Sequence, residues 1–203
     1  MMLRIAVAKG RVAKEALAMM ADHGIHFDDI EETRKLIIPD TLNQYELILV
    51  KPSDTAVYVE QGVADCGIVG KDILVEDNPD VYRLFALDIG RCKMCVAGRP
   101  ETDFRKMEKV VAASKYVNSA KDFFNNIGID YEIIKLNGSV ELAPLLNMSD
   151  VIVDIVQTGS TLKENGLVVL EEIYDITSVF IANKAALKTK HDEMETLIKL
   201  FQR

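Results

Sequence analysis

The chain has 203 residues, 49% of them hydrophobic and 28% charged, and its formal net charge is −8. This composition is typical of a soluble globular protein with one large domain or two lobes. The negative charge argues against a broad basic surface for nucleic acid, and no segment approaches the roughly 18 apolar residues that span a membrane. The N-terminal apolar run is too short for a signal peptide, so we expect a cytoplasmic protein that binds neither nucleic acid nor membrane.

The three cysteines, Cys66, Cys92 and Cys95, argue against a disulfide framework. The pair Cys92 and Cys95 has the spacing of half a zinc site or of a redox pair. Its flanking residues predict a strand, however, and no second Cys or His pair lies at the spacing of metal ligands. We therefore expect reduced structural thiols, with metal or redox chemistry as the alternative.

The first predicted strand covers residues 3–8, and Lys9, Gly10 and Arg11 separate it from a helix over residues 12–23. A strand, a glycine turn and a helix start form an anion site, here with two cations added. Ligands of open α/β sheets bind at such strand ends. The alternative is that Lys9 and Arg11 are ordinary exposed turn residues.

Arg34 stands among acidic residues just before the second predicted strand. From the residues alone, the first expectation for Arg34 is a surface ion pair. The elements that follow alternate: strands over residues 36–39, 45–50 and 63–70, and helices over residues 54–61 (with Ser53 as N-cap) and from Lys71 and Asp72 onward.

The second half of the chain begins with longer β-like runs over residues 81–98, which indicate a crossover between lobes. The later predicted elements are strands over 110–113, 131–136 and 151–156, helices over 117–126 and after Ser139, a β-rich return over 167–183 and a helix over 185–201. The expected fold is α/β and two-lobed. Lobe I comprises residues 1–92 plus 180–203, lobe II comprises 93–179, and a ligand is expected in the cleft between them.

A short hydroxyl-rich loop, Gln157 to Thr161, follows the buried strand 151–156 and leads into a helical turn closed by Gly166. The loop amides and hydroxyls can point inward, and the helix start adds partial positive charge. A phosphate monoester is the natural ligand of such a loop. Familiar nucleophile, P-loop and zinc-protease motifs are missing from the sequence, which fits chemistry by positioning and charge neutralisation.

The segment Gly138 to Pro144, taken with Asp154 to Leu167, resembles the signature of the ATP phosphoribosyltransferase family. Further matches to that family extend over nearly the whole chain, at Ala8 to Arg11, Arg34 to Ile37 and Gly62 to Asp72. The resemblance implies a periplasmic-binding-protein-like (type II) architecture. It also implies a reaction that joins N1 of ATP to C1 of 5-phosphoribosyl 1-diphosphate (PRPP), with release of diphosphate, as the first step of histidine biosynthesis.

The resemblance further implies roles for individual residues. Asp154 and the loop Thr158, Gly159, Ser160 and Thr161 would hold the ribose and 5-phosphate of PRPP, and Glu141 would contribute to the same site. The catalytic cations would be Arg11 and Arg34, which changes the expectation for Arg34 from a surface ion pair. The remaining candidates are Lys9 and Gly10 for the phosphates and Asp72 near the nucleotide. Mg²⁺ would be carried mainly by the substrate phosphates, with no metal site in the protein.

The chain resembles the short form of the family, which works in a hetero-oligomer with a regulatory subunit similar to histidyl-tRNA synthetase. Two other readings stay open on the residues. One is a non-catalytic two-lobed module that binds a phosphorylated small molecule, since the same fold type serves both classes. The other is a phosphoribosyltransferase for another base, which the phosphate loop by itself does not exclude.

Overall fold

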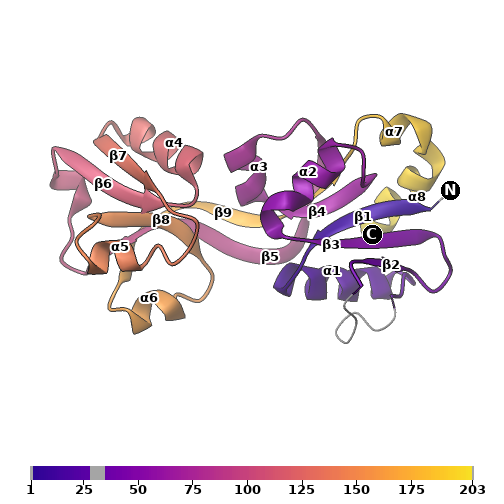
Figure 1. Cartoon of the computed structure of the whole chain (residues 1–203), viewed down its shortest axis with the longest axis horizontal. Coiled ribbons are helices and arrows are strands. Elements are labelled where there is room, and N and C mark those ends of the chain that lie inside the picture. Colours follow the sequence, from indigo (N-terminus) through magenta and orange to yellow (C-terminus); the bar gives the residue numbers. More distant parts are fainter. Residues whose placement is uncertain (1, 28–34, 203) are drawn as a thin grey trace. The chain divides into compact units, whose positions relative to one another are not determined.

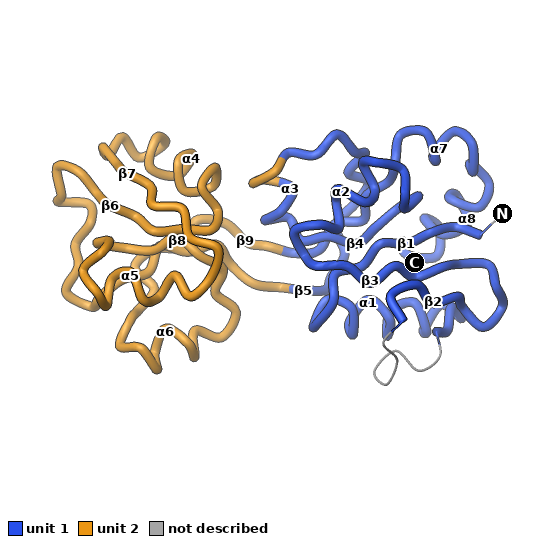
Figure 2. Tube along the Cα trace, viewed as in Figure 1, with its two compact units in different colours: residues 1–74, 78–90, 177–203 blue, residues 75–77, 91–176 orange. Residues whose placement is uncertain are grey.

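The computed structural model describes residues 2–27 and 35–202, in which helices and strands alternate along the chain (Figure 1). Residue contacts divide the chain into two compact units (Figure 2). Unit 1 contains residues 1–74, 78–90 and 177–203, and unit 2 contains residues 75–77 and 91–176. Both ends of the chain therefore belong to unit 1, and the two long strands β5 (Tyr82–Gly98) and β9 (Val168–Ala182) contribute to both units.

Unit 1 is built on three parallel strands. The central strand β1 pairs in parallel with β3 and β4, while β2 pairs antiparallel with β3, and β9 antiparallel with β4. The elements of this unit are β1 (Leu3–Ala8), α1 (Arg11–Asp22), β2 (Ile37–Pro39), β3 (Tyr45–Val50), a 3₁₀ turn (Pro52–Asp54), α2 (Thr55–Glu60), β4 (Cys66–Gly70), the start of α3 (Lys71–Asp77), α7 (Ala186–Thr189) and α8 (His191–Phe201).

The two faces of β1 carry different side chains because successive residues of a strand point to opposite sides. Leu3, Ile5 and Val7 are buried in one hydrophobic cluster together with residues of α1 and α8. After Arg4 the other face carries the small residues Ala6 and Ala8, and on the neighbouring β4 a Cβ atom at Gly67 would lie 2.9 Å from the side chain of Val59 in α2. Small residues thus let α2 approach the sheet closely.

Unit 2 is a second α/β layer in which β6 pairs in parallel with both β7 and β8, and β5 pairs antiparallel with β8. Its elements are a 3₁₀ turn (Phe104–Lys106), β6 (Lys109–Ser114), α4 (Val117–Ile127), β7 (Asp130–Lys135), α5 (Leu142–Leu145), β8 (Val151–Val156) and α6 (Ser160–Glu164). The carboxyl ends of β6, β7 and β8 therefore lie at one edge of the sheet. None of the helices within the described ranges has the length and hydropathy to cross a bilayer.

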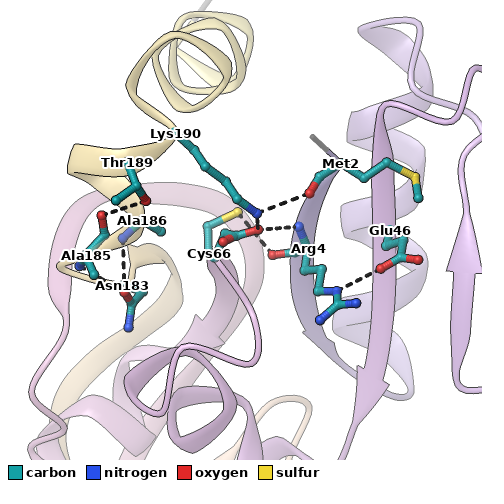
Figure 3. A network of polar contacts seen from close by, with 10 residues as sticks. Met2, Arg4, Glu46, Cys66, Asn183, Ala185, Ala186, Thr189 and Lys190 are labelled. Carbon is teal, nitrogen blue, oxygen red and sulfur yellow. Dashed lines mark hydrogen bonds and ion pairs between the residues drawn. The ribbon is translucent and has the colours of Figure 1, made fainter.

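The single helix predicted over residues 185–201 is wrong, because the structure has two helices, α7 and α8, that are interrupted at Lys190. The Lys190 Nζ atom donates hydrogen bonds to Asp65 Oδ2 at 2.7 Å and to the carbonyl oxygen of Met2 at 3.2 Å (Figure 3). The same Asp65 oxygen accepts the backbone N–H of Arg4 at 2.8 Å. The interruption at Lys190 accompanies a contact between residues that are 125 positions apart in the sequence. A contact over this distance leaves no signal in the helical periodicity.

Two predicted N-caps are also wrong. Ser53 lies inside the 3₁₀ turn Pro52–Asp54 and its Oγ bonds to Asp54 Oδ1, so α2 begins only at Thr55. Ser139 has a left-handed backbone with φ of 49°, and α5 begins three residues later at Leu142. In both cases a turn is inserted between the serine and the helix, so the serine hydroxyl cannot reach the first helical amides.

We expect Lys190→Met to lower the free energy of unfolding by about 2 kcal/mol, because the mostly buried Asp65 carboxylate loses its cationic partner. The side chains of Lys190 and Asp65 are only 17% and 11% exposed. Denaturation in urea measures the change. The control is Lys199→Met, since Lys199 pairs with Glu195 on α8 at 65% and 49% exposure, and it is expected to change stability by less than about 0.5 kcal/mol. Equal losses in the two variants would contradict the role of Lys190.

Candidate functional site

Cationic residues follow the carboxyl ends of all three parallel strands of unit 1. Lys9 comes directly after β1, Lys51 after β3 and Lys71 after β4, and all three are exposed. The backbone N–H of Lys9 donates to the carbonyl oxygen of Val50 at 2.8 Å, which joins two of these strand ends. With Arg11 added, this cationic edge (Lys9, Arg11, Lys51 and Lys71) concentrates positive charge in a chain of net charge −8, as anion binding requires. Sequence reasoning missed Lys51, although its position after a strand was a usable signal.

Gly10 and Arg11 form the start of α1. Gly10 has φ of 101° and ψ of −144°, and it is the N-cap residue of this 12-residue helix. Apart from its chain neighbours, no atom of the described residues lies within 4 Å of where a Cβ would be, so the backbone conformation and not space demands glycine. The first turn holds no acidic residue and begins with a cation, which the helix dipole disfavours. Local helix stability therefore does not explain Arg11, and its binding of an anion stays a prediction.

The Arg11 guanidinium is held by a partner on its own helix. Arg11 Nη1 donates to Glu15 Oε1 at 3.0 Å, one turn further along α1. The second oxygen of Glu15 accepts the backbone N–H of Gly90 at 2.6 Å. Glu15 was not predicted from the sequence, although a spacing of four residues from Arg11 is the usual signal for a side-chain pair on a helix.

The two remaining candidates of unit 1 differ in what the structure reveals. Asp72 is buried and lies in the first turn of α3, where its carboxylate folds back over Gly70. An acidic residue at this position stabilises the start of the helix, and its contact with a nucleotide stays a prediction. Arg34 lies outside the described residues.

The hydroxyl loop of unit 2 follows the carboxyl end of β8. Gly159 has a left-handed backbone with φ of 72° and precedes the first residue of α6. The Thr158 and Ser160 hydroxyl oxygens lie 3.1 Å apart, and the backbone N–H of Ser160 donates to Thr158 Oγ1 at 3.4 Å. Thr158, Ser160 and Thr161 are all exposed. The loop therefore presents several neutral donors to solvent in a compact turn.

Two buried leucines, one within α6 and one three residues after it, fix the base of this loop. Leu162 and Leu167 belong to the hydrophobic cluster of unit 2. Gly166 N–H donates to Lys163 O at 3.1 Å and Leu167 N–H to Leu162 O at 2.8 Å, which is the Schellman end expected from Gly166. Because α6 has only five residues, its dipole adds little, and the hydroxyls and amides of the loop supply the donors.

The two predicted carboxylates of unit 2 lie on elements that end at the same sheet edge. Glu141 is half-buried in the turn after β7, and its neighbours Val140 and Ala143 pack in the same cluster as Leu162 and Leu167. Asp154 is half-buried in β8, two residues before the strand ends. The structure thus gives Glu141, Asp154 and the loop a common edge of one unit.

Comparison with known proteins identifies the family. A family model described as ATP phosphoribosyltransferase matches residues 51–203. An ATP phosphoribosyltransferase of Brachyspira hyodysenteriae is 49% identical over 203 residues, covering 98% of this chain and 97% of that protein. The chain belongs to the ATP phosphoribosyltransferase family. Its reaction is therefore the joining of ATP to PRPP with release of diphosphate, the first step of histidine biosynthesis.

Solved structures confirm the predicted fold type. A chain of the ATP phosphoribosyl transferase (HisG:HisZ) complex from Thermotoga maritima is 30% identical, with a TM-score of 0.83 over 99% of this chain and 97% of that chain. An alkanesulfonate-binding protein from Xanthomonas axonopodis pv. citri is 11% identical, with a TM-score of 0.63 over 98% and 71%. The second likeness shows the two-lobed binding-protein fold alone. Family membership decides for the enzyme over the non-catalytic module.

The three thiols of this ATP phosphoribosyltransferase homologue differ in burial. Burial raises the pKa of the Cys95 thiol to about 11, with the nearby Glu172 carboxylate adding to the shift, and burial also raises the pKa of Cys66. We expect Cys66 and Cys95 to resist a thiol reagent at pH 8, since only about one Cys95 thiol in a thousand is ionised there. Half-buried Cys92 reacts first.

Counting labelled cysteines by mass spectrometry checks this, with the urea-unfolded protein as the control in which all three thiols react. Rapid labelling of Cys95 in the folded protein, or a Cys92–Cys95 disulfide after mild oxidation, would support redox chemistry instead.

Proposed function

We propose that the chain is the catalytic subunit of a short-form ATP phosphoribosyltransferase in which unit 1 neutralises the diphosphate and unit 2 holds PRPP by its 5-phosphate. The observation that carries the proposal is the cationic edge, where Lys9, Arg11, Lys51 and Lys71 follow three parallel strands. The reaction forms a bond between N1 of ATP and C1 of the ribose, and the bond from C1 to the diphosphate oxygen breaks. Negative charge develops on the leaving diphosphate, and fixed cations stabilise it.

In unit 1 the residue roles follow from this change in charge. Arg11 and Arg34 act as the catalytic cations, because a guanidinium can donate two parallel hydrogen bonds to phosphate oxygens. Lys9 and the amides beside Gly10 bind phosphate groups, and Asp72 lies toward the nucleotide. No protein nucleophile is needed, since ATP itself attacks C1.

In unit 2 the loop Thr158 to Thr161 binds the 5-phosphate through hydroxyl and amide donors. Asp154 accepts hydrogen bonds from the ribose hydroxyls, and Glu141 contributes to the same part of the site. The support for this arrangement is that all these residues lie at the carboxyl edge of unit 2 on elements anchored in one hydrophobic cluster. We assign these substrate roles to the lobes 1–92 plus 180–203 (ATP and diphosphate) and 93–179 (PRPP).

Mg²⁺ fits this site as a companion of the substrate. Within residues 2–27 and 35–202 no group of three His, Cys, Asp or Glu side chains could hold a metal ion. Mg²⁺ commonly binds through substrate phosphates and keeps several waters. When bound in this way, the ion neutralises part of the phosphate charge, while the lysines and arginines of unit 1 position the diphosphate.

The protein partner and the compartment belong to the same proposal. The chain is nearly coextensive with the Thermotoga maritima chain, whose structure is a HisG:HisZ complex. We propose that this chain likewise forms a hetero-oligomer with a regulatory subunit similar to histidyl-tRNA synthetase. The buried free thiols of Cys66 and Cys95 support a reducing compartment, the cytoplasm.

Incubation of the chain with ATP, PRPP and Mg²⁺ tests the proposed assembly through the ultraviolet absorbance of the product. On size-exclusion chromatography, we expect the synthetase-like subunit to co-elute with the chain. In the absorbance assay, we expect this subunit to raise the turnover of the chain about tenfold or more, because it binds the active state more tightly. Omission of PRPP is the control for ATP hydrolysis. Full turnover without the subunit, together with failure to co-elute, would contradict the proposed partner.

Asp154→Ala is expected to raise the KM for PRPP by about tenfold or more, because the ribose hydroxyls lose a charged acceptor. The KM for ATP should stay within about twofold, since Asp154 is assigned no contact with ATP. Asp130→Ala is the matched control, because Asp130 is exposed at the amino end of β7, and it should leave both KM values unchanged. Unchanged PRPP kinetics in Asp154→Ala would contradict the ribose role.

A further inference from the structure

Glu15 occupies a position between the proposed catalytic Arg11 and a fixed point of the backbone. Its Oε1 atom accepts Arg11 Nη1 at 3.0 Å, and the side chains of Arg11 and Glu15 are 39% and 36% exposed. A pair this exposed contributes little to folding. The order of charges is also the less favourable one for a helix, since the cation precedes the anion by four residues. Stability alone therefore gives little reason for the pair.

The second oxygen of Glu15 is anchored to the main chain. Oε2 accepts the backbone N–H of Gly90 at 2.6 Å, a short bond of the charge-assisted kind. Gly90 is buried and has φ of 71°, which only glycine adopts without strain. A Cβ atom there would lie 2.7 Å from Ser178 Oγ and 3.2 Å from Val12 Cγ2. Close packing thus fixes the position of the Gly90 amide. The amide in turn fixes the Glu15 carboxylate.

We propose that Glu15 is a positioning residue that holds the Arg11 guanidinium in one orientation for the departing diphosphate; this rests on the proposed role of Arg11. An exposed arginine samples many rotamers, and each must be given up when it binds a phosphate oxygen. The bond to Glu15 restricts that freedom beforehand and uses one of the five N–H donors of the guanidinium, which leaves donors for phosphate. Preorganised donors lower the barrier more than mobile ones do.

Glu15→Gln separates the two bonds. A glutamine side chain can still accept the Gly90 N–H bond, but it carries no charge to hold the guanidinium. In the complex with the regulatory subunit, Glu15→Gln is expected to lower kcat about tenfold. The KM values for ATP and PRPP should stay within about twofold, and the melting temperature should be unchanged.

Glu195→Gln is the matched control, because Glu195 forms a pair of the same spacing with Lys199 on α8. It should leave kcat unchanged. A merely structural role for Glu15 would instead lower the melting temperature and leave kcat per folded enzyme at its normal value.

A double-mutant cycle with Arg11→Ala decides whether Glu15 acts through Arg11. With Arg11 replaced, Glu15→Gln is expected to cause no further loss of kcat. A normal kcat in Glu15→Gln, or an equal loss in both backgrounds, would overturn the positioning role while leaving Arg11 as assigned. A normal kcat in Arg11→Ala would overturn the proposed function of Arg11 itself, and with it the role of Glu15.

Discussion

Parallel pairing of β1 with β3 and β4 is the constraint on which the cationic edge depends. The register pairs Ala8 with Val50, so Lys9 and Lys51 leave the sheet side by side. Like charges placed together repel one another, and this repulsion lowers the stability of the folded chain. A bound polyphosphate removes the repulsion and adds attraction. The same strand register that builds the core of unit 1 therefore also places together the cations of the proposed phosphate site.

In the proposed function the two units bind phosphate with different chemistry, and the difference fits the reaction. The 5-phosphate of PRPP keeps its charge from substrate to product, so neutral hydroxyls and amides, the role proposed for Thr158 to Thr161, suffice to hold it. The diphosphate gains negative charge as it leaves C1, and fixed cations, the role proposed for Arg11, bind it more strongly in the transition state than in the substrate. Only interactions that strengthen in this way accelerate a reaction. Uniform cationic binding at both ends would tighten substrate binding without raising turnover.

Local patterns in the sequence predicted the elements around the site, because strand ends, glycine turns and helix starts depend on near neighbours. The strand 3–8, the Gly10 turn and the loop closed by Gly166 all have the predicted form. Long-range contacts were not predictable in this way. The interruption at Lys190 depends on Asp65, 125 residues away, and Glu15 depends on Gly90, 75 residues away. Neither pairing leaves a periodic signal in a single sequence.

These two long-range contacts differ in what they do for the molecule. Lys190 is mostly buried and completes the bonding of a buried carboxylate, so its contact contributes to stability. Around Arg11, by contrast, several local rules fail together: a cation begins a helix, its partner follows in the less favourable order, and a left-handed glycine holds that partner. Departures from local preference that cluster in this way mark functional sites. The Arg11–Glu15 pair is exposed, so its unfavourable order lowers the stability only slightly. In the proposed role of Glu15, the Arg11 guanidinium already has its orientation before the diphosphate departs.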